Sequence, residues 1–228
     1  MMVDLSAIVS AGPYLMQGLW FTLQITLVGV AGGIVFGSLL AVARLSHNRL
    51  VAMLATAYVN LMRSIPLILV IFWVFFLVPW AIGWLTRSGR PVAVGASLTI
   101  FVTFVLFEAA YYAEIVRAGF RSISPGQYSA CDALGLSKFH AYIYILFPQA
   151  IRAVLPILLT QTIVLFQDTS LVYVISATDL LGAATKIAQR DGRLVEMYLT
   201  VGVIYFLICY AASQLVKQLQ RRLAFGVR

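Results

Sequence analysis

The sequence predicts an all-α polytopic membrane protein with five transmembrane helices. Of its 228 residues, 62% are hydrophobic and only 11% are charged, whereas a soluble domain is about half apolar and a quarter charged. Apolar blocks long enough to cross a bilayer recur along the whole chain. The net charge is +8, but the basic residues lie at the ends of the apolar blocks. That placement is typical of a membrane-topology signal and argues against a nucleic-acid partner.

The first span is predicted over residues 14–43, which carry no charge, and Arg44 follows at its end. Gly33 and Gly37 form a small-xxx-small pair, which allows a second helix to approach closely in a membrane.

The second span is predicted over residues 50–84 and contains a break. Pro66 removes a helical hydrogen bond and pushes Ile65 away from α geometry, so the helix is broken or kinked there. Asn60 and Arg63 lie beside the break. Irregular backbone at membrane depth is tolerated only against protein or a wet cavity, so these side chains are expected to face one of the two.

The remaining spans are predicted over 92–112, 153–175 and 194–216, with a polar loop at 176–193, so that one membrane domain covers 14–216. Five spans place the termini on opposite sides. If the N-terminus is outside, ten Lys and Arg are cytoplasmic and five are external, with Arg63 as the sixteenth. The positive-inside rule therefore favours an external N-terminus, a cytoplasmic C-terminus and a cytoplasmic segment at 124–149.

The segment at 124–149 is predicted to form two short helices at the membrane surface. Ser124 and Gln127 are spaced as a capping box with Pro125 in the first helical position. Gly135 suits a left-handed stop, and Ser137 can cap the second helix. The pattern indicates a docking element.

Asp168 is the most informative charge inside a span, because ionisable residues there are costly. Gln161 lies seven residues earlier on the same helix face, and Thr169 extends the polar stretch. One interpretation is a substrate route in which Asp168 binds an ammonium group. The other is structural: Asp168 pairs with an arginine or accepts backbone hydrogen bonds from a broken helix.

The planar guanidinium of Arg63 suits a carboxylate, which could belong to a substrate, to Glu108 or to Asp168. A structural pair is the favoured role. Glu114 and Arg117 are spaced for a local ion pair.

The sequence lacks the motifs that nucleotide hydrolysis, metal binding and triad catalysis require. The chain has no G-x-x-x-x-G-K-[ST] phosphate loop, and its two histidines, His47 and His140, form neither a metal pair nor a triad. Cys131 and Cys209 have no metal spacing and are predicted to be packing residues. We therefore expect neither an enzyme nor a metal site.

Ordered motifs over most of the chain resemble those of a known family. The segments similar to the cytoplasmic EAA loop of ABC importer permeases are AEIVRAG (113–119), SISPGQ (122–127), ALGLS (133–137) and LFPQAIR (146–152). Those similar to the polar amino-acid branch are RSIPL (63–67) and VLFQDTSLVYVIS (164–176).

This resemblance implies a type I ABC importer transmembrane domain, a multi-pass protein of the cell inner membrane. It implies an ATP-binding subunit dimer that receives the coupling loop, a periplasmic amino-acid-binding protein, and a second permease subunit, homologous or identical. ATP would be bound by the partner, and this chain would need no cofactor. Glutamate or aspartate is the expected substrate.

The resemblance assigns contact with the ATPase to one turn-rich segment: Gly126, Gln127, Tyr128, Ser129, Ala130, Asp132, Leu134 and Gly135. Ser129 stands where the family has a glutamate, and Asp132 could partly replace it. Docking is therefore expected to depend on shape and apolar contact from Tyr128, Ala130 and Leu134.

The resemblance also suggests a substrate site, with candidates Asn60, Arg63, Gln161, Asp168 and Thr169. A neutral Gln161 fits an acidic substrate because it does not repel one. Two other functions remain open: an ion-coupled secondary transporter that uses Asp168 and Glu108, or a non-transporting assembly subunit. The lack of an internal repeat argues against the first, and ion-driven uptake without an ATPase would support it.

Overall fold

The computed structural model describes residues 5–224, and every regular element in that range is helical. Five stretches are long and apolar enough to span a membrane: Ser6–Ala43, Leu67–Leu85, Ala96–Arg121, Lys138–Ile175 and Leu194–Leu223. The predicted all-α fold with five spans is therefore confirmed.

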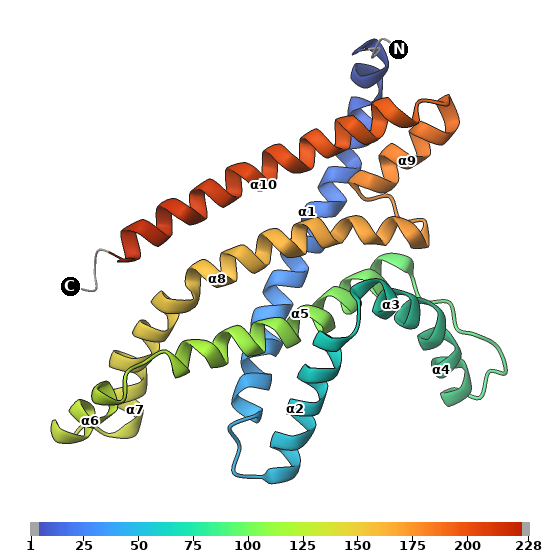
Figure 1. Cartoon of the computed structure of the whole chain (residues 1–228). Helices are drawn as coiled ribbons and strands as arrows, with labels where there is room; N and C mark the ends of the chain where they lie inside the picture. Colours follow the sequence, from blue (N-terminus) through green and yellow to red (C-terminus); the bar gives the residue numbers. More distant parts are fainter. Residues whose placement is uncertain (1–4, 225–228) are drawn as a thin grey trace.

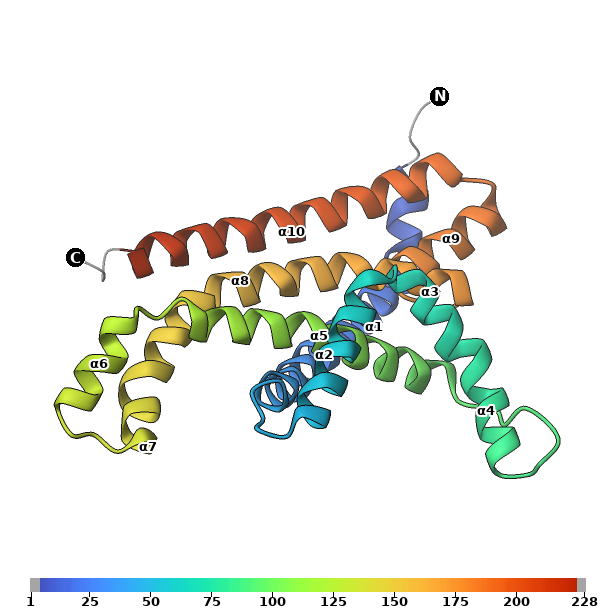
Figure 2. The ribbon, with the colours of Figure 1, turned by 60° about the horizontal axis from the view of Figure 1, so that its bottom comes forward.

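The helices follow one another with short connections. In chain order they are α1 (Leu5–Ala43), α2 (Arg49–Ser64), α3 (Leu67–Phe72), a π-helical stretch (Trp73–Leu77), α4 (Val78–Leu85), α5 (Ala96–Arg121), α6 (Pro125–Ala133), α7 (Lys138–His140), a second π-helical stretch (Ala141–Leu146), α8 (Phe147–Asp168), a 3-10 helix (Thr169–Ile175), α9 (Leu180–Asp191) and α10 (Leu194–Ala224). In Figure 1, α5, α8 and α10 run in alternating directions and α1 crosses them. Figure 2 shows α6 and α7 projecting together at one end of this bundle.

Glycines bring α1 and α5 into close contact, as the small-xxx-small pair predicts. A Cβ atom added to Gly33 would lie 2.7 Å from the ring of Tyr112. One added to Gly37 would lie 2.9 Å from the carbonyl oxygen of Ala109. Only a hydrogen atom fits at either position, so the two helix backbones lie against each other there.

The second apolar region is two helices joined at Pro66. α2 ends at Ser64, Ile65 is extended with φ −114° and ψ 136°, and α3 begins at Leu67. Proline lacks an N–H and restricts the residue before it, which explains the break. The span expected over 50–84 is therefore interrupted, and its second part alone, Leu67–Leu85, has the hydropathy of a span.

The polar loop predicted at 176–193 is wrong, because most of this segment is helix α9. Asp179 caps its start by accepting hydrogen bonds from the N–H groups of Leu181 (3.1 Å) and Gly182 (3.0 Å), and Gly192 ends it with φ +68°. Residues at helical spacing pack against α1 and α10, namely Leu180, Ala183, Ala184, Ile187 and Ala188. The polar residues that suggested a loop lie between these positions in an amphipathic helix.

Span boundaries also differ from the expected ones. The first helix begins at Leu5, before residue 14, and the third runs from Ala96 to Arg121 in place of 92–112. The fourth helix is continuous with the segment that precedes it, from Lys138 onward. Cys131 and Cys209 are buried and unbonded, which agrees with packing roles.

Candidate functional site

A polar cluster lies near Tyr111 of α5, which is half-buried. The guanidinium carbon of Arg63 lies 5.6 Å from the centre of the Tyr111 ring, a distance typical of a cation–π contact. Arg63 belongs to the last turn of α2, directly before the break at Pro66. Helix α2 therefore ends directly after the arginine that lies over the Tyr111 ring.

Arg63 does not make the structural ion pair that the sequence favoured. Among residues 5–224 the ion pairs involve other arginines, and no carboxylate lies within 4.0 Å of Arg63. Its side chain is exposed. The guanidinium of Arg63 lies over the ring of Tyr111, and neither Glu108 nor Asp168 is within ion-pair distance of it. Its charge therefore remains free for another carboxylate.

Gln161 contacts Glu108 and joins α8 to α5. The amide nitrogen of Gln161 donates to the two carboxylate oxygens of Glu108 at 3.1 and 3.4 Å. Glu108 is fully buried, with 0% of its surface exposed. A buried carboxylate needs a hydrogen-bond donor, and Gln161 provides it. The side chain of Gln161 therefore binds a residue of the protein, Glu108, before any substrate is present.

Asp168 occupies the end of α8 and is half-buried. Within the described part of the chain its side chain makes no ion pair or hydrogen bond. Thr169 follows it, fully buried, and its hydroxyl donates to the carbonyl of Phe166 at 2.7 Å. Thr169 is thus part of the core, whereas Asp168 stays available.

The structure therefore places Arg63 against Tyr111, and Gln161 against Glu108 one turn earlier on α5. Asp168 lies two turns beyond Gln161 on the same face of α8. Asn60 lies one turn before Arg63 on the same side of α2 and is exposed. A guanidinium and a carboxylate that have no ionic partner among residues 5–224 match the two charged groups of an amino acid.

The predicted coupling segment at 124–149 begins with the helix α6, which is followed by a left-handed turn. Gly135 has φ +66°, and its N–H donates to the carbonyl of Asp132 at 3.0 Å, as the predicted stop requires. Ser137 caps the next helix by accepting from the N–H of His140, which confirms its predicted role. The capping box is wrong: Ser124 makes no side-chain cap, and the side chain of Gln127 instead accepts from Gln149 of α8 at 3.0 Å.

The predicted ATPase-contact residues divide into two groups. Gly126, Ser129, Ala130, Asp132, Leu134 and Gly135 are exposed. Leu134 stands out, because 73% of its surface is exposed. Gln127 and Tyr128 are half-buried, and the hydroxyl of Tyr128 donates to the carbonyl of Phe120 at 3.5 Å, so it holds α6 against α5.

Three charged residues tie α1 to α5 close to the coupling segment. The predicted pair of Glu114 and Arg117 is confirmed. Arg44, at the end of α1, adds a second hydrogen-bonded ion pair to Glu114 at 2.5 Å. A carboxylate shared by two guanidiniums fixes the relative position of the two helix ends.

Sequence reasoning missed two contributors. Tyr111 was not singled out, because an aromatic residue in an apolar span has no distinctive pattern; only its position opposite Arg63 marks it. Glu108 was considered only as a partner of Arg63 or as an ion-coupling residue, so its complete burial and its hydrogen bond with Gln161 were not predicted.

Known proteins resemble this chain over nearly its whole length. The profile of the family described as "Binding-protein-dependent transport system inner membrane component" matches residues 33–225. The chain is 50% identical over 223 residues to the "Glutamate/aspartate import permease protein GltK" of Escherichia coli O6:H1, which covers 97% of this chain and 98% of that protein. It is 33% identical to the "Glutamine transport system permease protein GlnP" of Escherichia coli K12, over 98% of this chain and 99% of that one.

Solved structures show the same architecture. One is described as "Crystal structure of an amino acid ABC transporter with histidines"; it superposes with a TM-score of 0.87 at 29% identity and covers 97% of this chain and 100% of that one. An inward-facing structure of the MetNI methionine ABC transporter has a TM-score of 0.72 at 22% identity, covering 92% and 96% of the two chains, and supports the fold alone. The chain thus belongs to the family of binding-protein-dependent transport system inner membrane components, as the membrane subunit of a type I ABC importer of the amino-acid group.

Proposed function

We propose that this subunit imports an acidic amino acid, glutamate or aspartate, and that the cluster around Tyr111 contacts the substrate on its route. The observation that carries the proposal is that the guanidinium of Arg63 lies over the Tyr111 ring, while neither Arg63 nor the half-buried Asp168 has an ionic partner among residues 5–224. A guanidinium binds a carboxylate bidentately, and a carboxylate binds an ammonium group. The high identity to a glutamate/aspartate permease supports the choice of substrate.

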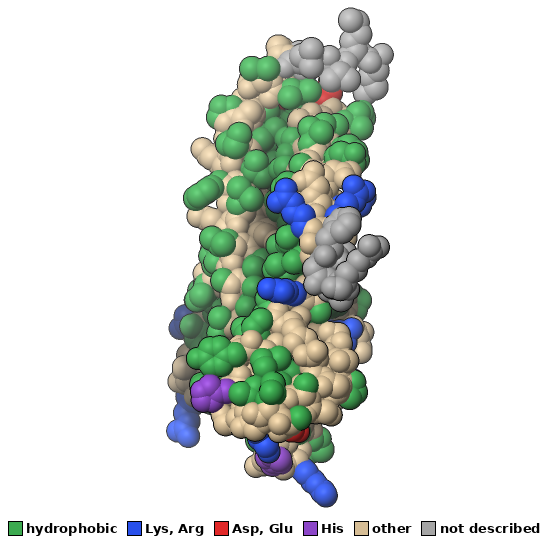
Figure 3. Space-filling model, turned by 90° about the vertical axis from the view of Figure 1, so that its left-hand side faces the viewer, with side chains coloured by type: hydrophobic (Ala, Val, Ile, Leu, Met, Phe, Trp, Pro, Cys, Tyr) green, Lys and Arg blue, Asp and Glu red, His purple; other side chains and the backbone are tan. Residues whose placement is uncertain are grey.

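Transport is driven by the partner that hydrolyses ATP. The ATPase dimer docks on α6 and the following turn, where Ala130 and the exposed Leu134 provide apolar contact and Ser129 provides no charge. A periplasmic binding protein delivers the amino acid, and a second permease, identical or homologous, completes the pathway. Figure 3 shows Lys and Arg side chains at several places on the face of the molecule to which α6 and α7 project, which supports a cytoplasmic position for this face and an external N-terminus.

The substrate proposal is tested by competition. The importer complex with its ATPase and binding protein is reconstituted in proteoliposomes, and ATP-driven uptake of labelled glutamate is measured against unlabelled glutamate, aspartate, glutamine and arginine. We expect the two acidic amino acids to compete best. Stronger competition by glutamine or arginine would overturn the assignment.

The role of Arg63 is tested in the same assay. Arg63→Gln keeps a polar side chain but removes the charge, so glutamate uptake should fall by at least tenfold, since one charged hydrogen-bonding partner contributes about 1.5–3 kcal/mol. The matched control is Arg222→Gln, which removes an exposed charge at the end of α10. Equal uptake by both variants would exclude Arg63 from the substrate site.

Docking is tested with Leu134→Asp, which places a charge on the exposed apolar turn. We expect the ATPase subunit to co-purify less with this variant than with Leu134→Met. Unchanged recovery of the ATPase would show that docking does not depend on this residue.

A further inference from the structure

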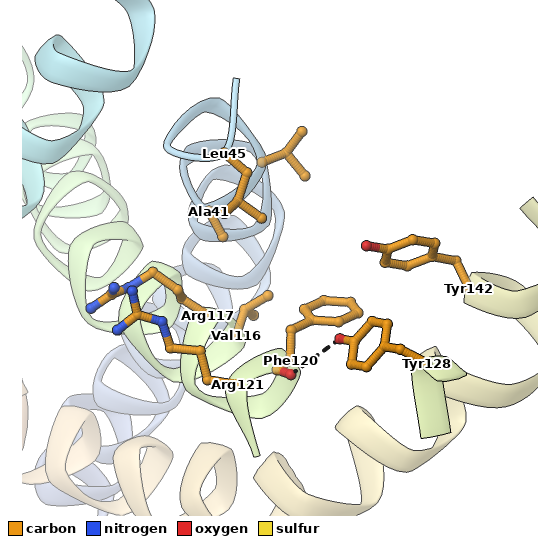
Figure 4. A pocket seen from close by; sticks show the side chains of 9 residues that line it. Ala41, Leu45, Val116, Arg117, Phe120, Arg121, Tyr128 and Tyr142 are labelled. Atoms are coloured by element: carbon orange, nitrogen blue, oxygen red, sulfur yellow. Dashed lines mark hydrogen bonds between the residues drawn. The ribbon is translucent and has the colours of Figure 1, made fainter. Parts of the chain in front are cut away.

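A cavity of about 400 Å³ lies beside the coupling segment, apart from the polar cluster. Its apolar floor comes from the end of α1 and from α5, with Val42, Leu45, Val116 and Phe120 among the residues that line it. Figure 4 shows Leu45, Val116 and Phe120 on one side of the opening and Tyr142, from the segment after α7, pointing toward it from the other. Tyr128, one of the predicted ATPase-contact residues, also lines the cavity, whereas the residues named above have no assigned role in the substrate route or in ATPase docking.

Positive charge gathers on one side of this cavity. Arg117 and Arg121 line it from successive turns of α5, and their side chains extend in the same direction in Figure 4. Arg117 shares Glu114 with Arg44, whereas Arg121 is exposed and has no carboxylate partner among residues 5–224. Three guanidiniums against one carboxylate leave a local excess of positive charge.

An apolar stripe leads into the same cavity along the outer face of α1. Val35, Leu39, Val42 and Leu45 follow one another at three- or four-residue spacing, and each has more than half of its surface exposed, from 57% to 69%. On a spanning helix such a stripe fits lipid chains. The stripe ends where the arginines begin, as the acyl region of a bilayer gives way to its head groups.

We propose that this cavity binds an anionic phospholipid. The phosphate group lies at Arg121 and Arg117, and one acyl chain follows the stripe from Leu45 toward Val35. Basic pockets at the ends of transmembrane helices recognise acidic head groups through this combination of charge and apolar surface. Tyr142, half-exposed at the same level, suits the interface between acyl chains and head groups.

The proposal is tested on the complete purified importer by native mass spectrometry, with titrations of phosphatidylglycerol and of zwitterionic phosphatidylcholine. Wild-type complex should bind phosphatidylglycerol more tightly. Arg121→Gln should weaken the tightest phosphatidylglycerol site by about fivefold, the effect of one basic residue near a lipid surface, and should leave phosphatidylcholine binding unchanged. Val116→Phe, which fills the cavity without changing charge, should weaken the same site.

Arg222→Gln is the control, because it removes an exposed arginine from the last turn of α10, outside the cavity. It should leave the tightest site unchanged. Three results would each overturn the proposal: equal affinity for the two lipids, equal loss in Arg121→Gln and Arg222→Gln, or no loss in Arg121→Gln. The last would mean that protein, such as the ATPase or a second permease, covers the cavity in the complex.

Discussion

Gln161→Glu is expected to abolish glutamate uptake because of Glu108, not because of the substrate. The substitution replaces the amide that donates to Glu108 with a second carboxylate at the same place. Repulsion then acts between α5 and α8 before any amino acid arrives. A lower uptake by this variant alone therefore does not show that Gln161 faces the substrate.

The size of the effect follows from the contact distance. Two unit charges 3.1 Å apart repel by about 5 kcal/mol at an effective dielectric constant of about 20. Loss of a hydrogen bond to a charged group adds about 1.5–3 kcal/mol. About 1.4 kcal/mol corresponds to a tenfold change in an equilibrium constant. The combined cost should therefore reduce uptake by more than a hundredfold, even if separation of the helices relieves about half of the repulsion.

The double variant Glu108→Gln/Gln161→Glu exchanges the two side chains and restores one amide beside one carboxylate. We expect this exchange to recover most ATP-driven glutamate uptake in proteoliposomes, with equal amounts of assembled complex checked by size-exclusion chromatography. Two outcomes would refute the reasoning. One is normal uptake by Gln161→Glu; the other is an exchanged variant that assembles fully but remains as inactive as the single one.

Three other changes have expected outcomes. Gly37→Ala puts a methyl group against the α5 backbone and should lower the free energy of unfolding by about 1–3 kcal/mol, as overpacking does. Gly202→Ala is the control, because its methyl group would meet no atom within 4 Å and stability should not fall. Equal melting temperatures of the two variants would contradict the close contact. In Gly135→Pro the new residue cannot adopt φ +66° and lacks the N–H donor. ATP hydrolysis should therefore continue without uptake in this variant, whereas Gly135→Asn should still transport. Coupled transport by the proline variant would exclude a hinge at this position. Burial raises the pKa of Asp179 from 3.8 to about 6, so the folded protein binds this proton more tightly than the unfolded chain does. The melting temperature should therefore fall as the pH rises between these two pKa values and level off above the higher one. In Asp179→Asn this slope should disappear, and an unchanged slope would assign it to another group.

Patterns local in sequence were predicted correctly. The five apolar spans, the glycine pair of α1, the break at Pro66 and the left-handed Gly135 each depend on a few neighbouring residues, and the structure shows all of them. These features follow from hydropathy and backbone sterics, which act over one or two turns.

Features that depend on distant contacts were not predictable. α9 was taken for a loop because its polar face is visible in the sequence, while the surfaces of α1 and α10 that bury its other face are not. Arg63 was expected to pair with an acid, and the competing partner was the ring of Tyr111. Gln127 suited a capping box, but Gln149, 22 residues later, competes for its side chain. In each case a partner far along the chain decided between locally reasonable alternatives.

The length of α1 links this importer to the bilayer that contains it. At 39 residues and 1.5 Å per residue the helix is about 59 Å long, nearly twice the roughly 30 Å of a hydrocarbon layer. It must therefore lie strongly tilted or extend beyond the layer, and in Figure 1 it runs obliquely across α5 and α8. Because its glycines seat it on α5 and Arg44 fixes its end to Glu114, a thicker membrane would change that tilt only by straining the bundle. Acyl-chain length should thus shift the balance between the transport conformations.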